Sequence, residues 1–191
     1  MATTLDENKM MSIATKLADM KAIQAQMISN EQKLMSAITG DQEISKRMQD
    51  MLNDDQESLG TIESAISNVG MQAGADEKTK KFIESIEGLM AGNELSLYEK
   101  ASQHESLKHQ LTMIGLVVHK AAQAAGGDLE KTIDPINKVN FKNRAHQEQL
   151  KGILYALGTR ELVGKEPDKS IWAGIEDAIA AAKGAFQGLA E

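Results

Sequence analysis

The sequence contains no cysteine, only two prolines among 191 residues, and few aromatic residues, 3% of the chain. Without cysteine, the chain has no disulfide, no thiolate nucleophile and no zinc site of the cysteine type. Proline breaks helices and aromatic residues are enriched in strands, so the scarcity of both favours an all-α fold. Eleven methionines are present instead. Because methionine adapts to irregular gaps, we interpret them as core residues rather than as a docking surface.

The formal net charge is −7, and acidic and basic residues alternate along the chain without forming a basic stripe. Domains that bind nucleic acids present a basic patch to the phosphates, so this pattern predicts no nucleic-acid partner. The N-terminus lacks the basic and apolar segments of a secretory signal, and the apolar stretch at residues 111–118 is too short to span a bilayer. We therefore expect a cytoplasmic protein without a membrane partner.

Apolar residues recur every three or four positions along most of the chain, which is the period of one helix face. They predict four long helices and two shorter ones, over residues 6–39, 42–69, 77–90, 94–125, 135–157 and 170–189, with Gly158 and then Gly164 closing the helix that begins at 135. Residues 113–118 are apolar on all sides of the helix except at one glycine. The helix at 94–125 is therefore predicted to be the central rod, covered by neighbours on several sides.

These helices predict an antiparallel four-helix bundle with a short extra helix and a C-terminal fifth helix. The bundle domain covers residues 1–164, and the C-terminal amphipathic helix at 165–191 packs on it. The apolar side of this last helix consists of Ile171, Trp172, Ile175, Ile179, Ala182, Phe186 and Leu189. Its polar face lacks the excess of Lys and Arg found on membrane-surface helices, so we favour packing on the bundle over docking on a membrane or a partner.

Polar side chains interrupt each of the four long apolar stripes near mid-length. They are Glu31 on the first helix, Asp55 on the second, His104 on the third, and Asn143 with His146 on the fourth. Burying an unpaired carboxylate costs several kcal/mol, so these groups must find one another, water or a cation. With a tight turn near Gly40, Asp55 is displaced from Glu31 by about 9 Å at 1.5 Å per residue, so the two carboxylates are not expected to share one metal ion.

A resemblance to a known family rests on four stretches: residues 30–34 (NEQKL), 57–63 (ESLGTIE), 86–90 (IEGLM) and 121–127 (AAQAAGG). In order and approximate spacing, they resemble the small bacterial, stress-associated ferritin-like proteins of the YciE/YciF type. Ferritin-like bundles hold two iron or manganese ions with glutamates from two helices and Glu-x-x-His motifs from the other two.

The resemblance implies a metal centre that has lost most of its ligands. It places Glu31 at the first-helix glutamate of the family and His109 at an acidic position of the third helix. His146 keeps the histidine of a Glu-x-x-His motif whose glutamate is replaced by Asn143. The candidate ligands for iron or manganese are Glu31, Glu57, His109 and His146. The apolar stripe favours His104 over His109 as the inward-facing histidine, and the choice between them stays open.

Each polar position also has a purely structural interpretation. Gln24 or Asn143 on an apolar stripe usually fixes the helix register through hydrogen bonds. His146 can donate a hydrogen bond to a carboxylate such as Glu31 without any metal. Asp55 belongs to the charged run at residues 54–57, which is typical of a solvated helix face.

Three hypotheses for function follow, because no motif of a hydrolase, a nucleotide-binding protein or a metalloprotease is present. The first is a non-enzymatic ferritin-like bundle with a degenerate metal centre and no cofactor, acting as a structural or interaction protein and forming a homodimer through an outer helical face. The second is an iron- or manganese-binding oxidoreductase with an incomplete or mononuclear site. The third is a coiled-coil adaptor or lipid-surface binder that uses the C-terminal helix.

Overall fold

The computed structural model describes residues 6–187, apart from the side chains of residues 183 and 185–187. Its helices are α1 (Glu7–Ala37), α2 (Gln42–Val69), α3 (Glu77–Ala91), α4 (Leu97–Ala125), α5 (Gly127–Ile133), α6 (Ile136–Val163) and α7 (Ser170–Gln187). The described part of the chain contains no strand, so the predicted all-α class is confirmed. None of the helices in this part is both long and apolar enough to cross a membrane.

Local signals in the sequence determine where most of the helices begin and end. The Asp41 carboxylate caps α2 by accepting a hydrogen bond from the backbone N–H of Ile44 at 3.0 Å. Ser96 and Glu99 form a reciprocal capping box, so α4 begins at Leu97 rather than at the predicted residue 94. At the other end of the chain, α6 continues past residue 157 to Val163, where Gly164 adopts a left-handed φ of 65° and ends the helix.

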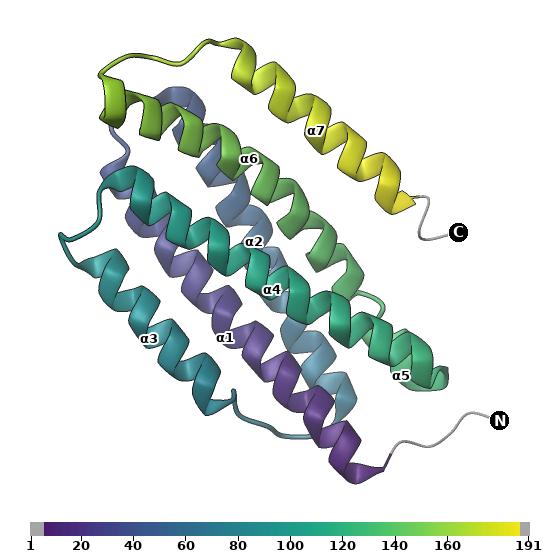
Figure 1. Cartoon of the computed structure of the whole chain (residues 1–191). Helices are drawn as coiled ribbons and strands as arrows, with labels where there is room; N and C mark the ends of the chain where they lie inside the picture. Colours follow the sequence, from purple (N-terminus) through teal and green to yellow (C-terminus); the bar gives the residue numbers. More distant parts are fainter. Residues whose placement is uncertain (1–5, 188–191) are drawn as a thin grey trace.

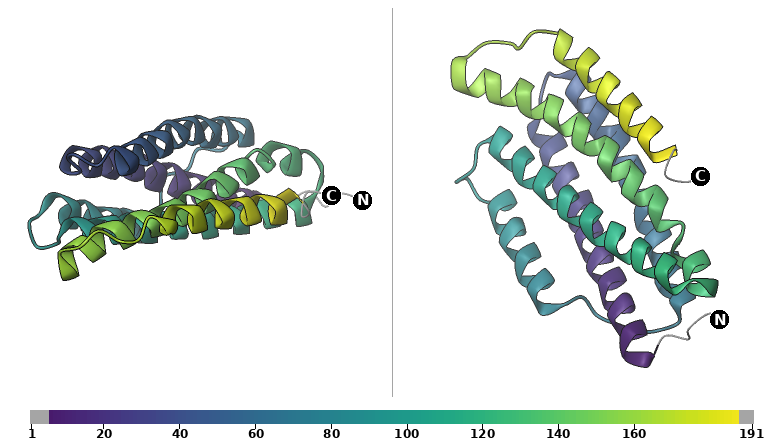
Figure 2. Two further views of the ribbon diagram at one scale, coloured as in Figure 1. Left: turned by 90° about the horizontal axis from the view of Figure 1, so that it is seen from above. Right: turned by 45° about the vertical axis from the view of Figure 1, so that its right-hand side comes forward.

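Four long helices enclose the main core (Figure 1). α4 packs on α1 and α6, and α2 packs on the same two helices. α3 lies against α1 and α7 against α6, so these two helices occupy opposite outer sides of the molecule (Figure 2). Asp19, buried on α1, accepts a hydrogen bond from the backbone N–H of Asp76 at 2.8 Å and thereby holds the start of α3.

Methionine is a major component of this core, as the sequence predicted. The buried methionines are Met20, Met27, Met48, Met51 and Met90. The expected burial of α4 on several sides is only partly correct, because Met113 and Val117 are 46% and 63% exposed. One side of α4 therefore stays open between its contacts with α1 and α6.

The C-terminal helix α7 packs through its apolar side, where Ile175 and Ile179 contact Ala145 of α6. Trp172 lies over Gly152, and a Cβ atom at that glycine would come within 2.5 Å of the Trp172 ring. The Phe186 side chain and Leu189, which were predicted on the same side, lie outside the described residues. The division into a bundle domain at 1–164 and a C-terminal helix at 165–191 stays a prediction.

Candidate functional site

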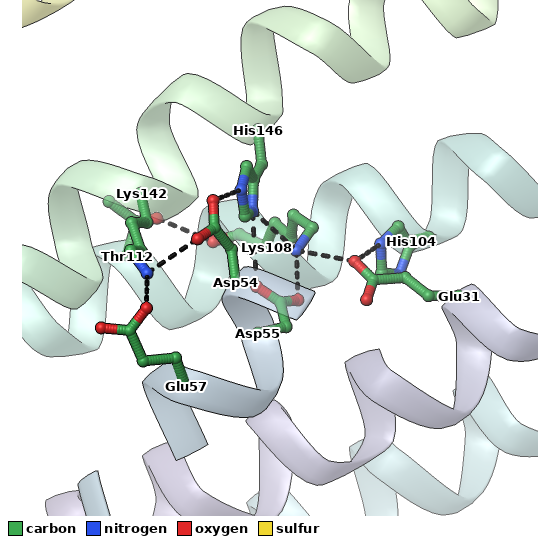
Figure 3. A network of polar contacts seen from close by, with 9 residues as sticks. All are labelled: Glu31, Asp54, Asp55, Glu57, His104, Lys108, Thr112, Lys142 and His146. Carbon is green, nitrogen blue, oxygen red and sulfur yellow. Dashed lines mark hydrogen bonds and ion pairs between the residues drawn. The ribbon is translucent and has the colours of Figure 1, made fainter. Parts of the chain in front are cut away.

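A fully buried lysine, Lys108 of α4, lies at the centre of a polar network between four helices (Figure 3). Its Nζ is 3.0 Å from Oε1 of Glu31 on α1 and also contacts Oδ2 of Asp55 on α2. It lies 3.3 Å from Nδ1 of His146 on α6. Each of the four long helices thus contributes one charged or titratable side chain to the same point.

Opposite charges keep this centre ionised. Burial by itself lowers the pKa of the Lys108 ammonium, but the carboxylates of Asp55 and Glu31 outweigh burial and raise it. Burial likewise raises the pKa of Asp55, but Lys108 and His146 outweigh it and bring that pKa well below its usual range. An ammonium ion and carboxylate groups therefore lie together in the interior, where removal of either partner leaves an uncompensated charge.

The inner end of the network is formed by His104 and Glu31. His104 Nε2 lies 3.2 Å from Glu31 Oε1, and both side chains are completely buried. The other ring nitrogen of His104 and the other oxygen of Glu31 have no hydrogen-bond partner. This end of the network thus holds two unused polar atoms at positions that are closed to solvent.

His146 connects the buried lysine to the surface. Its Nδ1 is 3.3 Å from both Lys108 Nζ and Asp55 Oδ1, and its Nε2 is 3.2 Å from Asp54 Oδ2. Nδ1 therefore faces both a donor, Lys108, and an acceptor, Asp55, and it can accept from the first or, when protonated, donate to the second. A carboxylate can only accept, so Nε2 carries a proton and donates a hydrogen bond to Asp54. His146 thus links the buried ion pair to Asp54.

The outer end of the network consists of two carboxylates and two lysines at the surface. Lys142 Nζ lies 2.7 Å from Asp54 Oδ1 and 2.6 Å from Glu57 Oε2. Lys138 Nζ is 2.9 Å from Glu57 Oε1. The hydrogen bond from His146, followed by that from Lys142, outweighs burial and lowers the pKa of Asp54 to about 2. We call Asp54, Glu57, Lys138, Lys142 and the adjoining edge of His146 the surface corner.

A second polar layer lies beside the network, and its groups are poorly satisfied. Gln24, Asn140 and Asn143 are fully buried, and neither the amide nitrogen nor the amide oxygen of any of them has a hydrogen-bond partner. Gly115 makes room for one of these amides, because a Cβ atom there would come within 1.9 Å of Asn140 Oδ1. The predicted hydrogen-bonding role of Gln24 and Asn143 is therefore not seen.

The structure brings together two of the four predicted metal ligands. Glu31 and His146 both point inward and are joined through Lys108. Glu57 lies at the surface, where it pairs with lysines. His109 is exposed and receives a hydrogen bond of 3.1 Å from Gln147, so of these two histidines it is His104 that faces inward.

The expectation that Asp55 lies on a solvated face was wrong, because it is completely buried. The expectation that Asp55 and Glu31 do not share one metal ion stays a prediction, although both carboxylates contact the same ammonium group. The long side chain of Lys108 carries its ammonium to a position where both carboxylates reach it.

A two-metal centre of the ferritin-like kind does not fit these residues. Among the residues that the structure describes, no group of three or more His, Cys, Asp or Glu side chains is placed to hold a metal ion. Lys108 explains this, because its ammonium occupies the position between the carboxylates of Glu31 and Asp55. Metal binding by Glu31, Glu57, His109 and His146 stays a prediction.

Lys108 is the residue that the sequence patterns did not single out. The signal is present in the spacing, because His104, Lys108 and Thr112 recur every four residues and share one face of α4. All three are buried. The sequence pattern was assigned to the apolar stripe through Leu107 and Leu111, which lies directly beside this polar stripe, so the polar stripe was not recognised.

Comparison with known proteins finds one relative whose name refers to DNA. The chain is 48% identical over 185 residues to a protein named "DNA nickase" from Nostoc sp. (strain PCC 7120 / SAG 25.82 / UTEX 2576). The match covers 97% of this chain but only 52% of the relative, so the chain spans about half the length of that protein. No family model matches the chain, and no solved structure does.

This similarity corrects the hypotheses drawn from the sequence. A protein named for nicking DNA conflicts with a non-enzymatic structural role, with a ferritin-like oxidoreductase, with a stress-associated role and with an adaptor or lipid binder. It also conflicts with the expectation that nucleic acid is not a partner. The prediction relied on the net charge of −7, which sums over the whole chain. A phosphate interacts mainly with charges within about 8–10 Å at physiological salt, so the net charge does not describe the local electrostatics.

Proposed function

We propose that this chain acts on DNA and takes part in breaking one strand of a duplex. The observation that carries the proposal is the 48% identity to the "DNA nickase" of Nostoc over 97% of this chain. Because half of that protein lies outside the match, the proposal concerns the share of the reaction that this helical chain performs.

We infer that α1, α2, α4 and α6 form an antiparallel four-helix bundle that supports this function. Each of the four helices packs on two of the others, which closes a ring. The contacts also run in opposite directions along neighbouring helices. A Cβ atom at Gly115, late in α4, would lie 2.9 Å from Met20, which is early in α1. Glu31, late in α1, contacts Lys108, which is earlier in α4.

The surface corner is the part of the network that a DNA phosphate can reach. Glu57 and Lys138 are 56% and 66% exposed, and exposed ion pairs contribute only about 0–1 kcal/mol each. A phosphodiester can therefore displace the Glu57 carboxylate and take its place on Lys138 and Lys142. The new contacts are charge-assisted hydrogen bonds of the kind that lysine forms with phosphates.

Asp54 lies in position to serve as the base in this corner. It is ionised at neutral pH because its pKa is about 2. A phosphate bound to Lys142 draws this ammonium away from Asp54 and adds a negative charge beside it, and both effects raise the pKa of Asp54. A carboxylate with a raised pKa is a better proton acceptor.

Hydrolysis then proceeds in a single displacement. The oxygen of a water molecule forms a bond to phosphorus, the bond from phosphorus to one sugar oxygen breaks, and Asp54 accepts the water proton. The leaving sugar oxygen takes a proton from solvent. His146 holds Asp54 in place from below, because its second nitrogen faces the buried Lys108 and its ring is only 3% exposed.

Conversion of supercoiled plasmid to the open circular form, followed on an agarose gel, tests the proposal. We expect nicking by the wild-type chain, and a loss of about 100-fold or more in Asp54→Asn, as is typical for removal of a general base. Lys142→Met should lose activity and Lys142→Arg should retain part of it, because the arginine keeps the positive charge. Lys21→Met is the matched control, since Lys21 forms an exposed pair with Glu63 at 2.8 Å outside the corner.

Two results would contradict different parts of the proposal. Nicking that survives both Asp54→Asn and Lys142→Met would show that the surface corner is not the reacting site. If the chain neither nicks nor binds plasmid DNA, alone or joined to the remaining half of the Nostoc protein, then the function itself is wrong.

A further inference from the structure

Glu57 of α2 lies at the outer end of the network and bridges two lysines of α6. Its Oε2 is 2.6 Å from Lys142 Nζ (Figure 3), and its Oε1 is 2.9 Å from Lys138 Nζ. The two lysines are four residues apart, so they lie on one face of α6. Each oxygen of the carboxylate thus contacts a different ammonium group. A phosphodiester offers the same arrangement with its two non-bridging oxygens, and lysine binds phosphate through charge-assisted hydrogen bonds.

We infer that Glu57 is a built-in substitute for a DNA phosphate. In the unbound chain its carboxylate occupies the phosphate position of the surface corner and closes it to free phosphate, and it yields this position to a phosphodiester of duplex DNA. The inference rests on the proposed function, because it takes the surface corner as the place where the DNA phosphate binds. It adds the residue that determines which anion enters.

The two carboxylates of the corner are held in different ways. Asp54 is held from two sides, by His146 Nε2 at 3.2 Å and by Lys142 Nζ at 2.7 Å. Among the described residues, the Glu57 carboxylate contacts only Lys138 and Lys142, and 56% of its side chain is exposed. An incoming anion that takes over the two lysines therefore displaces Glu57, whereas Asp54 stays in place on His146.

The charges of the corner favour a ligand with one negative charge. Asp54 and Glu57 balance Lys138 and Lys142 when all four are ionised, and the hydrogen bonds from the lysines lower the pKa of Glu57 and keep it ionised. Departure of Glu57 leaves one uncompensated positive charge. A phosphodiester supplies one negative charge, whereas inorganic phosphate, like a phosphomonoester, carries more than one at pH 7.5. The excess charge of inorganic phosphate would lie beside Asp54 and be repelled.

Duplex DNA has a second advantage over a free anion. A single phosphate must displace Glu57 without other contacts to the protein. A duplex carries many neighbouring phosphates, so contacts elsewhere on the chain hold one of them at a high effective concentration beside the corner. Glu57 therefore sets a threshold that a polyanion passes and a free phosphate does not.

Binding of a short fluorescein-labelled duplex without terminal phosphates, followed by fluorescence anisotropy, tests the inference. Glu57→Gln keeps the size of the side chain and removes the competing charge, so we expect it to bind the duplex about three- to tenfold more tightly than the wild type. Its affinity should also fall more steeply with salt, by up to about one in the slope of log K against log salt concentration. Unchanged circular dichroism shows that the variant is folded.

Glu63→Gln is the matched control. Glu63 is also on α2, forms an exposed pair with Lys21 at 2.8 Å, and lies outside the corner. Its substitution changes the net charge by the same amount, so any general effect of charge on DNA binding is equal in the two variants. We expect Glu63→Gln to bind the duplex like the wild type.

Two further measurements connect the effect to the corner. Inorganic phosphate, exchanged for chloride at constant ionic strength, should compete with the duplex in Glu57→Gln but not in the wild type or in Glu63→Gln. Adding Lys142→Met to Glu57→Gln should remove both the tighter binding and the competition, because the ammonium group that Glu57 blocks is then absent.

Three outcomes would overturn the inference and leave the proposed function intact. They are duplex binding that is no tighter in Glu57→Gln than in Glu63→Gln, equal competition by inorganic phosphate in all three proteins, and a gain in affinity that persists after Lys142→Met. If none of the three proteins binds the duplex, the proposed function is wrong, and this inference is wrong with it.

Discussion

Replacing Lys108 by methionine is the most direct test of the buried network. The substitution keeps nearly the same side-chain length and removes one positive charge from a site with no exposure to solvent. Glu31 and Asp55 then remain buried without the cation that both now contact. Breaking a buried ion pair by removing one partner costs about 3–5 kcal/mol.

The expected change is large enough to measure by two methods. For a chain of this size, each kcal/mol shifts Tm by about 2–4 °C, so Lys108→Met should melt roughly 6–20 °C below the wild type. Urea unfolding followed by circular dichroism should show a free energy of unfolding lower by about 3–5 kcal/mol. Lys21→Met, at an exposed pair with Glu63, should change it by less than about 1 kcal/mol.

A compensated variant separates charge from packing. In the triple variant Lys108→Met, Glu31→Gln, Asp55→Asn, the two stranded charges are removed along with their partner. We expect it to recover much of the lost stability, because replacing a whole buried ion pair is often neutral, whereas breaking one is not. If Lys108→Met were no less stable than Lys21→Met, the interpretation of Lys108 as the counter-ion of two buried carboxylates would be refuted.

Two further predictions concern the packing of α7 and the start of α2. Gly152→Ala places a methyl group within 2.5 Å of the Trp172 ring, so it should lower the free energy of unfolding by about 1–3 kcal/mol. It should also shift the fluorescence of the single tryptophan to longer wavelength. The control is Gly60→Ala, at a helical site with nothing within 4 Å, which should raise the free energy of unfolding by about 0.5–1 kcal/mol. Asp41→Asn retains an N-cap side chain but loses the 2.5 Å contact with Arg160. Burial raises the pKa of Asp41, but the Ile44 N–H and Arg160 outweigh burial and lower that pKa below its ordinary value of 3.8. The ionised carboxylate therefore stabilises the fold above about pH 4, and this stabilisation is lost as the pH falls further. The acid-induced loss of stability between pH 4 and 2 should therefore be smaller in Asp41→Asn than in the wild type, and equal losses in the two proteins would contradict this account.

The helices could be predicted from the sequence because their signals are local. Asp41 and Gly164 mark a helix start and a helix end through their own hydrogen bond and backbone conformation. Where the prediction differed, a competing local signal was stronger. The capping box of Ser96 moved the start of α4 to Leu97, and of the two glycines expected to close α6 only Gly164 has a left-handed conformation and ends it.

The site could be predicted only in part, because its geometry depends on how helices pack. Glu31, His104 and His146 were expected to face inward from the apolar stripes, and they do. Whether Asp55 and Glu31 meet depends on how far side chains reach across the helices. Counting residues along the chain from Gly40 does not give this distance. Lys108 was missed for a related reason, since a lysine at a helical position is normally solvated and becomes a buried ion only when two carboxylates from other helices meet it.

The order of charges through the network explains how a buried group can influence the surface. From the interior outward, the contacts run from His104 to Glu31, Lys108, His146, Asp54 and Lys142. Lys108 and Asp55 hold Nδ1 of His146 from the inside, and Nε2 of the same ring donates a hydrogen bond to one oxygen of Asp54. The other oxygen of Asp54 contacts Lys142, the proposed phosphate ligand. The interior therefore determines the orientation of the proposed base although no buried residue touches the DNA, and a change at Lys108 that leaves the fold intact should reduce nicking through Asp54 rather than through DNA binding.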